Sequence, residues 1–403
     1  MEKHGSLLGG TLLIAGTTIG GGMLALPVLT CLGGFLPSLV IYTLCWLFMT
    51  ATGLLFLEVS LWLHRDANIV SMAESTLGKW GKAFAWLLYI FLFYCLSLAY
   101  IVGCGDYIRE ILGIQGHAYI GTALFIGIFG TLVIMGTRLV SAVNGVLVGI
   151  MITLFFSIIF MGIPHINFEH LVRRDWNLSL LSLPVSFTAF AYQGTVPTLV
   201  NYLNYDVRRI RLAIIIGSFI PLVTYIIWQT VILGIVPTFG NEGLLNALNE
   251  GENAVQPLKY FIQNPWLILV SGLFAFIALL TSFFGVTLGL VDFLSDGLKI
   301  KKSGSGKWIL SLLVFLPPFL ISLWKSNLFL EALDLAGGYG CSLLLGLLPV
   351  IMVWRGRYHM QLNEQNQLPG GKMILILLGA FVAFEVAIQI MINLGVFGID
   401  IGG

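Results

Sequence analysis

The chain has 403 residues, of which 58% are hydrophobic and only 10% are charged, and its formal net charge is +1. A soluble domain carries about 25% charged residues, so this chain cannot cover an ordinary water-facing surface. The composition predicts a protein that crosses a membrane many times, and the near-neutral charge argues against a nucleic-acid partner.

A membrane-spanning helix needs about 20 apolar residues. Eleven stretches qualify, at 7–32, 35–63, 82–111, 118–136, 140–163, 183–203, 211–236, 266–297, 308–324, 328–354 and 372–396. If the connecting segments alternate between the two sides, 15 of the 20 Lys and Arg residues fall on one side. The positive-inside rule then predicts a cytoplasmic N-terminus and a C-terminus on the opposite face.

The first stretch contains the motif IAGTTIGGGMLALP at 14–27, with four glycines and two threonines where a spanning helix should be regular. Glycine weakens a helix by roughly 1 kcal/mol per residue. Backbone groups freed in this way must line a protein-walled cavity, because lipid cannot satisfy them. The motif predicts a broken helix, although close packing of small residues against a neighbouring helix is an alternative.

The sixth stretch reads FAYQGTVPTLV at 190–200, with Gly194 and Pro197 near its middle, and it predicts a second break. Breaks in spans 1 and 6 fall at equivalent places if spans 1–5 (residues 1–164) and spans 6–10 (residues 183–354) are inverted repeats. Paired interrupted helices of this kind mark the binding site of many secondary transporters. We therefore predict an all-α transport domain over 1–403, with eleven spans, a 5+5 inverted repeat and an additional span at 372–396.

Three motifs carry a resemblance to a known family: AGTTIGGGMLALP at 15–27, FTAFAYQGTVPTLVNY at 187–202 and TSFFGVTLGLVDFL at 281–294. They resemble the tyrosine- and tryptophan-specific branch of the hydroxy/aromatic amino acid permeases, which is similar in fold to the leucine-transporter type. The likeness runs over nearly the whole chain. It implies uptake of an aromatic L-amino acid across the bacterial inner membrane by cation symport, usually with a proton, and a periplasmic C-terminus.

The resemblance also implies a substrate site. The backbone of 17–22 would meet the substrate carboxylate, the carbonyls of 190–193 would meet its ammonium group, and aromatic rings would form the pocket wall. The residues implied are Thr17, Thr18, Gly20, Gly21, Gly22, Tyr100, Phe190, Tyr192, Gln193, Gly194 and Thr195. Tyr94 is a rival to Tyr100, and Phe283 is a further candidate for the wall. Gln193 stands where close relatives usually have His, and an amide cannot titrate as an imidazole does.

A coupling-ion site is expected in span 8. Ala278, Thr281 and Ser282 follow the spacing i, i+3, i+4 and so share one helical face. Together with the carbonyls of Gly16 and Ile19, they match the five-oxygen sodium pattern of leucine-transporter-type proteins. Span 5 has no Lys that would compete for this place, so sodium stays open although the family favours the proton. Alternatively, both hydroxyls bond only to their own helix.

Carboxylates inside spans are the other place to look for proton chemistry, because burying a charge there is costly. Glu58 in span 2 is the leading candidate, either as a proton carrier or as a hydrogen-bond partner of the unwound backbone. Glu385 in span 11 has a weaker claim, and Asp334 in span 10 is expected to be solvated near the outer edge. Asp296 and Lys3 could pair as a cytoplasmic gate.

Two other protein classes are poorly supported. A membrane enzyme needs clustered acids, nucleophiles or metal ligands, but the six histidines lie in loops or near span ends and no HExxH motif is present. The five cysteines include no CxxC pair and read as core residues, so no cofactor or resident metal is expected. A channel would more often show a ring of like charges. The partners expected are a small aromatic amino acid and membrane lipid.

Overall fold

The structure, a computed structural model, describes residues 5–63, 68–114, 119–262, 264–325, 328–362 and 366–397. These residues form helices joined by turns. The longer helices are α1 Leu7–Thr18, α2 Gly21–Thr30, α3 Phe35–Trp62, α4 Ile69–Ile111, α7 Thr137–Gly162, α11 Val207–Ile235, α14 Pro265–Leu298, α15 Ser305–Trp324, η6 Ala336–Leu347, α17 Leu348–Tyr358 and α18 Gly371–Asn393. The shorter ones are α5 Tyr119–Phe125, η1 Ile126–Gly130, α6 Thr131–Met135, η2 Ile163–His165, η3 Phe168–Val172, α8 Trp176–Ser179, η4 Leu180–Ser182, α9 Leu183–Ala189, η5 Gln193–Thr195, α10 Val196–Tyr202, α12 Leu244–Asn249, α13 Val255–Phe261 and α16 Phe329–Leu335.

Eight helices in the described part of the chain are long and apolar enough to cross a membrane, or nine if the bent pair α1 and α2 counts as one span. Each of the nine overlaps one predicted stretch. The other two predicted stretches, 118–136 and 183–203, form a shorter apolar helix and a pair of short helices. The many-span architecture is therefore confirmed, whereas the full count of eleven spans stays a prediction.

Both predicted helix breaks are present. The axes of α1 and α2 differ by 51° across Ile19 and Gly20. The helix α9 ends at Ala189, and α10 begins at Val196 with Pro197 in its first turn, where proline lacks only an amide that has no helical partner. The break is thus short in the first span and covers six residues in the sixth.

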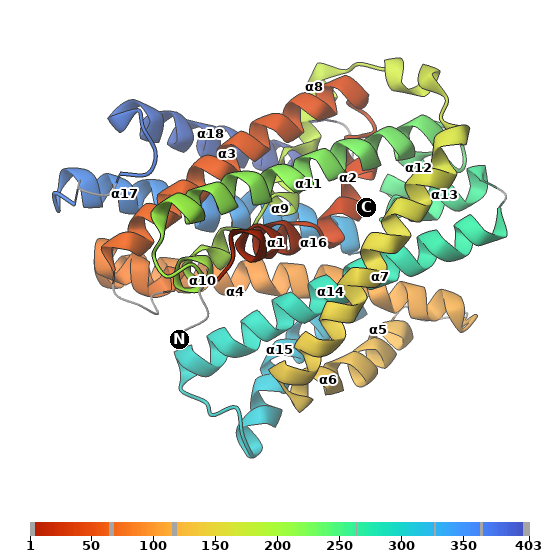
Figure 1. The fold of residues 1–403 in the computed structure, drawn as a ribbon. Helices are drawn as coiled ribbons and strands as arrows, with labels where there is room; N and C mark the ends of the chain where they lie inside the picture. The colour runs from red at the N-terminus through yellow and green to blue at the C-terminus, as the bar shows by residue number, and fades with distance from the viewer. Residues whose placement is uncertain are drawn as a thin grey trace.

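The broken helices lie in the middle of the bundle (Figure 1). The long helices α3 and α11 run along one side of α1, while α4 and α14 cross on the other. The helices α16 and η6 pack against α9, and α18 packs on the outside of η6. The two breaks therefore lie among other helices of the same chain.

Two regions next to the spans also form helix. The helix α4 starts at Ile69, well before the predicted span, and changes direction at Gly78, whose φ of +77° suits glycine. The segment 238–264 forms the short helices α12 and α13, and the amide of Ala254 donates to the carbonyl of Leu24 at 3.0 Å. This loop is thereby attached to the first turn of α2.

Candidate functional site at the two helix breaks

The first break exposes the amino end of α2. Gly20 provides no side-chain cap, and the amide of Gly21 donates instead to the Ser282 hydroxyl oxygen on α14 at 3.0 Å. Within the described residues, the amides of Gly20 and Gly22 donate no hydrogen bond. A helix N-terminus with unsatisfied amides carries partial positive charge and attracts an anion such as a carboxylate.

Tyr225 on α11 joins the two breaks, and the sequence analysis missed it. Its hydroxyl lies 2.7 Å from the carbonyl oxygen of Thr18 and 2.8 Å from that of Ala189, the last residues of α1 and α9. Its side chain is fully buried. The single hydroxyl proton is therefore shared by two carbonyls, one at the end of each helix, that have no partner within their own helix. Nothing in the pattern of α11 distinguishes this tyrosine, because its partners are distant in sequence.

Gln193 fastens the second break to α3. Its amide nitrogen donates to the Met49 carbonyl at 3.1 Å and to the Thr52 hydroxyl at 3.1 Å, and its oxygen accepts from the Tyr192 amide at 2.9 Å. The Tyr192 hydroxyl donates to the same Met49 carbonyl at 3.2 Å. Both side chains are buried against α3. Gln193 therefore holds the second break against α3 through hydrogen bonds that require no change of protonation.

The carbonyls of the second break fall into two groups. The Tyr192 oxygen accepts from the amide and hydroxyl of Thr195, at 2.8 and 2.7 Å, and the Gln193 oxygen accepts from Val196. The carbonyls of Phe190 and Ala191 accept no hydrogen bond within the described part of the chain. Of the four carbonyls that the resemblance implies, these two are the ones available to an ammonium group.

Tyr100 lies at the first break, and Tyr94 does not. A Cβ atom added to Gly21 would lie 3.0 Å from the Cδ1 atom of Tyr100, so glycine is needed for the close approach of α2 to α4. The Tyr94 hydroxyl instead donates to the Leu313 carbonyl on α15 at 2.7 Å. The geometry therefore favours Tyr100 over its rival.

The two phenylalanines proposed for the pocket wall lie in different places. Phe190 packs edge-to-face on Tyr225, with ring centroids 5.1 Å apart, so it belongs to the region of the breaks. Phe283 packs against Phe125 and Phe315, which come from α5 and α15. The structure thus places Phe283 among rings of α5 and α15, and its part in the pocket wall stays a prediction.

The span 8 hydroxyls bond to their own helix. Thr281 and Ser282 both donate to the Ala278 carbonyl, at 3.0 and 2.9 Å. Thr17 and Thr18 likewise donate to carbonyls one turn earlier in α1. Gly16, Thr17 and Gly194 are exposed, whereas Gly20 to Gly22 are buried. The breaks therefore have one accessible side and one sealed side.

Glu58 forms a buried ion pair with Arg357. Its two oxygens accept from the guanidinium of Arg357, each at 2.6 Å, and one also accepts from the Gln367 amide at 2.7 Å. The expectation that Glu58 hydrogen-bonds the helix breaks is wrong, because these groups occupy it. Its role as a proton carrier stays a prediction that the ion pair does not favour.

The other predicted charged residues also receive positions. Asp334 is buried, with 3% of its surface exposed, so the expectation of a solvated carboxylate is wrong. Glu385 is fully buried on α18. Asp296 is exposed at the end of α14, while its proposed gate partner Lys3 lies outside the described residues.

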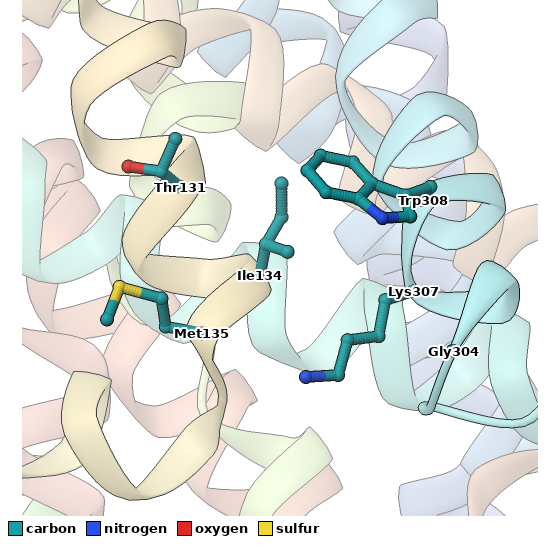
Figure 2. A pocket seen from close by; sticks show the side chains of 6 residues that line it. All are labelled: Thr131, Ile134, Met135, Gly304, Lys307 and Trp308. Atoms are coloured by element: carbon teal, nitrogen blue, oxygen red, sulfur yellow. The ribbon is translucent and has the colours of Figure 1, made fainter.

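A surface groove of about 420 Å³ lies between α6 and the start of α15 (Figure 2). The side chains of Ile134, Lys307 and Trp308 point into it. Its lining is mostly apolar, with the Lys307 ammonium as its charged group. The breaks, by contrast, present free backbone amides and free backbone carbonyls. The chemistry suited to an amino acid is therefore at the breaks.

The chain is similar in sequence to known transport proteins and in fold to a solved structure. The chain is 35% identical to the tyrosine-specific transport system 1 of Haemophilus influenzae, over 92% of this chain and 93% of the relative. It is 29% identical to the tryptophan-specific transport protein of the same organism, over 98% of both, and 29% identical to the low affinity tryptophan permease of Escherichia coli, over 93% and 92%. Its fold is similar to the crystal structure of MhsT in complex with L-phenylalanine, with a TM-score of 0.64, 17% identity and coverage of 97% and 99%.

The tryptophan/tyrosine permease family matches residues 3–391, which is nearly the entire chain. The matched relatives are transport proteins and permeases, not enzymes. Together with the apolar helices and the two breaks, this match establishes that the chain is a multi-pass membrane protein and belongs to the tryptophan/tyrosine permease family.

Proposed function

We propose that this protein imports an aromatic L-amino acid, tyrosine first and tryptophan second, by proton symport across the bacterial inner membrane. Eleven spans arranged as two inverted repeats plus a last helix, with a cytoplasmic N-terminus and a periplasmic C-terminus, are part of this proposal. The names of the relatives support the substrate class.

The observation that carries the proposal is that free backbone amides at the first break and free backbone carbonyls at the second lie on either side of Tyr225. The amides of Gly20 and Gly22 suit the substrate carboxylate, and the carbonyls of Phe190 and Ala191 suit its ammonium group. Tyr225 bonds to both broken helices, so the two ends lie close together. An amino acid zwitterion presents these two charges one carbon atom apart, and Phe190 provides an aromatic ring beside them.

The coupling ion follows from family membership, which favours the proton. Sodium is the alternative, held by the carbonyls of Gly16, Ile19 and Ala278 with the hydroxyls of Thr281 and Ser282. Hydroxyls that donate to Ala278 still have lone pairs that could turn towards a cation. Proton-coupled uptake responds to an imposed proton gradient and sodium-coupled uptake to an imposed sodium gradient, so one experiment distinguishes the two ions.

The test is uptake of radiolabelled tyrosine into proteoliposomes that contain the purified protein, with a proton gradient or a sodium gradient imposed separately. We expect accumulation above the external concentration with the proton gradient alone. Accumulation that requires sodium would replace the proton in the proposal. If neither gradient drives accumulation of tyrosine or of tryptophan, the symport proposal is refuted.

A further inference from the structure

A second group of buried polar side chains lies outside the helix breaks, between α16, η6 and α18. Asp334 has 3% of its surface exposed, while Glu385 and Gln389 are fully buried. Glu385 and Gln389 are four residues apart and share one face of α18. We call Asp334, Ser342, Glu385 and Gln389 the acid cluster.

The hydrogen bonds of the acid cluster are incomplete. The Gln389 amide nitrogen donates to one Asp334 oxygen at 2.8 Å, and the Ser342 hydroxyl contacts one Glu385 oxygen. The remaining oxygens of Asp334, Glu385 and Gln389 are buried without a partner in the described part of the chain. Gln389 thus directs an unpartnered carbonyl into a site that already holds two carboxyl groups.

Across the described ranges of the chain, no basic side chain pairs with these carboxyls. Neither Asp334 nor Glu385 joins an ion pair within the described residues. The titratable groups that face them are Glu331 on α16, Cys45 on α3 and Cys341 on η6, and none is a cation. Two unpaired carboxylates would be very costly here, so the buried state requires bound protons. A carboxylic acid also supplies the donor that the open oxygens lack.

The acid cluster has a polar connection to the surface. The Gln389 amide nitrogen also donates to the Asn393 side chain at 3.1 Å, and Asn393 donates to the Tyr339 hydroxyl at 2.9 Å. Asn393 is exposed at the end of α18. Hydrogen bonds therefore connect Asp334, through Gln389 and Asn393, to the exposed end of α18.

The helices α16 and η6, which carry Asp334 and Ser342, pack against the second broken helix. The Thr188 hydroxyl on α9 donates to the Leu333 carbonyl at 2.8 Å, next to Asp334, and Ser342 donates to the Gly337 carbonyl at 3.0 Å. A Cβ atom on Gly338 would overlap the Gln389 amide oxygen, so α18 and η6 approach as closely as glycine allows. The η6 segment is a π-helix of 12 residues, a backbone form that often occurs at functional sites.

We propose that Asp334 and Glu385, positioned by Gln389 and Ser342, bind the proton that is coupled to substrate transport. This inference rests on the proposed symport and assigns its proton to α16 and α18. The proton adds to a carboxylate oxygen of the acid cluster from one aqueous side and is released to water on the other. Loss of the proton would leave an unpaired charge against η6 and α9, which links the charge state to the second break.

The test compares wild type with Asp334→Asn and Glu385→Gln in proteoliposomes. With a pH difference of about one unit, one coupled proton supports about tenfold accumulation of tyrosine in the wild type. In both variants we expect tyrosine only to equilibrate. Exchange of internal for external tyrosine needs no net proton movement and should persist in both. Glu331→Gln, one turn earlier on α16, is the matched control and should accumulate tyrosine as the wild type does.

The outcomes separate the two proposals. If the wild type does not respond to the proton gradient, proton symport is refuted and the assignment falls with it. If the wild type and both variants accumulate tyrosine tenfold, only the acid-cluster assignment is overturned. If the variants do not fold, infrared difference spectroscopy of the wild type tests the assignment instead. Adding tyrosine should change the C=O stretching band of a buried carboxylic acid, and a spectrum without that change would also overturn the assignment.

Discussion

Two buried glutamates of this protein lie in similarly apolar helices but have different partners. Glu58 on α3 binds the Arg357 guanidinium through both oxygens. Among the described residues, Glu385 on α18 has a serine hydroxyl as its one hydrogen-bond partner and keeps one oxygen without a partner. The two glutamines differ in the same way. Both the nitrogen and the oxygen of the Gln193 side chain have hydrogen-bond partners, whereas the Gln389 oxygen has none among the described residues. A buried polar side chain whose hydrogen-bonding groups all have partners stabilises the fold. One that keeps a group without a partner can bind a proton or a ligand.

The largest effect should come from removing the carboxylate of the paired glutamate. Glu58→Gln leaves the Arg357 charge buried and uncompensated, which should lower the free energy of unfolding by about 3–5 kcal/mol. Glu385→Gln replaces a neutral acid with a neutral amide and should change it by about 1 kcal/mol or less. Thermal unfolding in detergent measures both. Equal losses in the two variants would contradict the distinction between them.

The next effect concerns the hydroxyl that joins the breaks. Tyr225→Phe leaves the carbonyls of Thr18 and Ala189 without their donor, so we expect a loss of about 1–3 kcal/mol and weaker tyrosine binding. Tyr94→Phe is the matched control, because its hydroxyl bonds a carbonyl of α15 away from the breaks. Calorimetric binding of tyrosine should be weakened only by the first substitution. Equal affinity in both variants would argue against a site at the breaks.

A smaller effect should distinguish two neighbouring hydroxyls on α14. Ser282→Ala removes the acceptor of the Gly21 amide and should destabilise the protein by about 1 kcal/mol. Thr281→Ala removes only a bond to its own helix and should stay within about 0.5 kcal/mol. Uptake assays with and without sodium complete the measurement. Equal loss of uptake in both variants, together with a sodium requirement, would favour the sodium site instead.

The smallest effect lies in the loop between α12 and α13. Burial, reinforced by the negative charge of Glu250, raises the pKa of Glu252 from 4.5 to about 7. The raised pKa means that the contribution of Glu252 to the free energy of unfolding is fully present below pH 4.5 and is lost as the pH rises through about 7. Glu252→Gln should therefore stabilise the protein at pH 8, by about 1 kcal/mol or less after solvent screening, and have no effect at pH 4.5.

Thermal unfolding of Glu252→Gln at pH 4.5 and pH 8 checks this expectation. Glu242→Gln, an exposed position on the same loop, serves as the control and should show no difference between the two pH values. Stabilisation of Glu252→Gln at pH 4.5 would contradict the sign of the effect.

The architecture was largely predictable because it depends on local sequence. Runs of apolar residues indicate the spans, and clustered glycine with Pro197 indicates the two breaks, since these residues weaken helices wherever they occur. The permease family was also predictable from the motifs around the breaks, and the family match confirms it. Local patterns thus lead to the fold and to the broken segments of the candidate site.

The partners of buried polar groups were not predictable, because they depend on contacts between distant residues. Arg357 counts as a loop charge in the sequence, yet 2% of its surface is exposed and it neutralises Glu58 across 299 positions. Asp334 appears solvated near a span end, but α18 covers it. Only the packing of α18 on η6 reveals which carboxyl groups lack a counter-charge.

The most direct test of this account records proton movement with a pH-sensitive dye inside proteoliposomes when tyrosine is added outside. Three proteins are compared: wild type, Glu385→Gln, and Glu58→Gln combined with Arg357→Met, which removes both charges of the ion pair and keeps an acceptor for Gln367. We predict tyrosine-evoked acidification of the lumen in the wild type and in the double variant, and none in Glu385→Gln. Acidification in Glu385→Gln together with its loss in the double variant would contradict the account and assign the proton to Glu58.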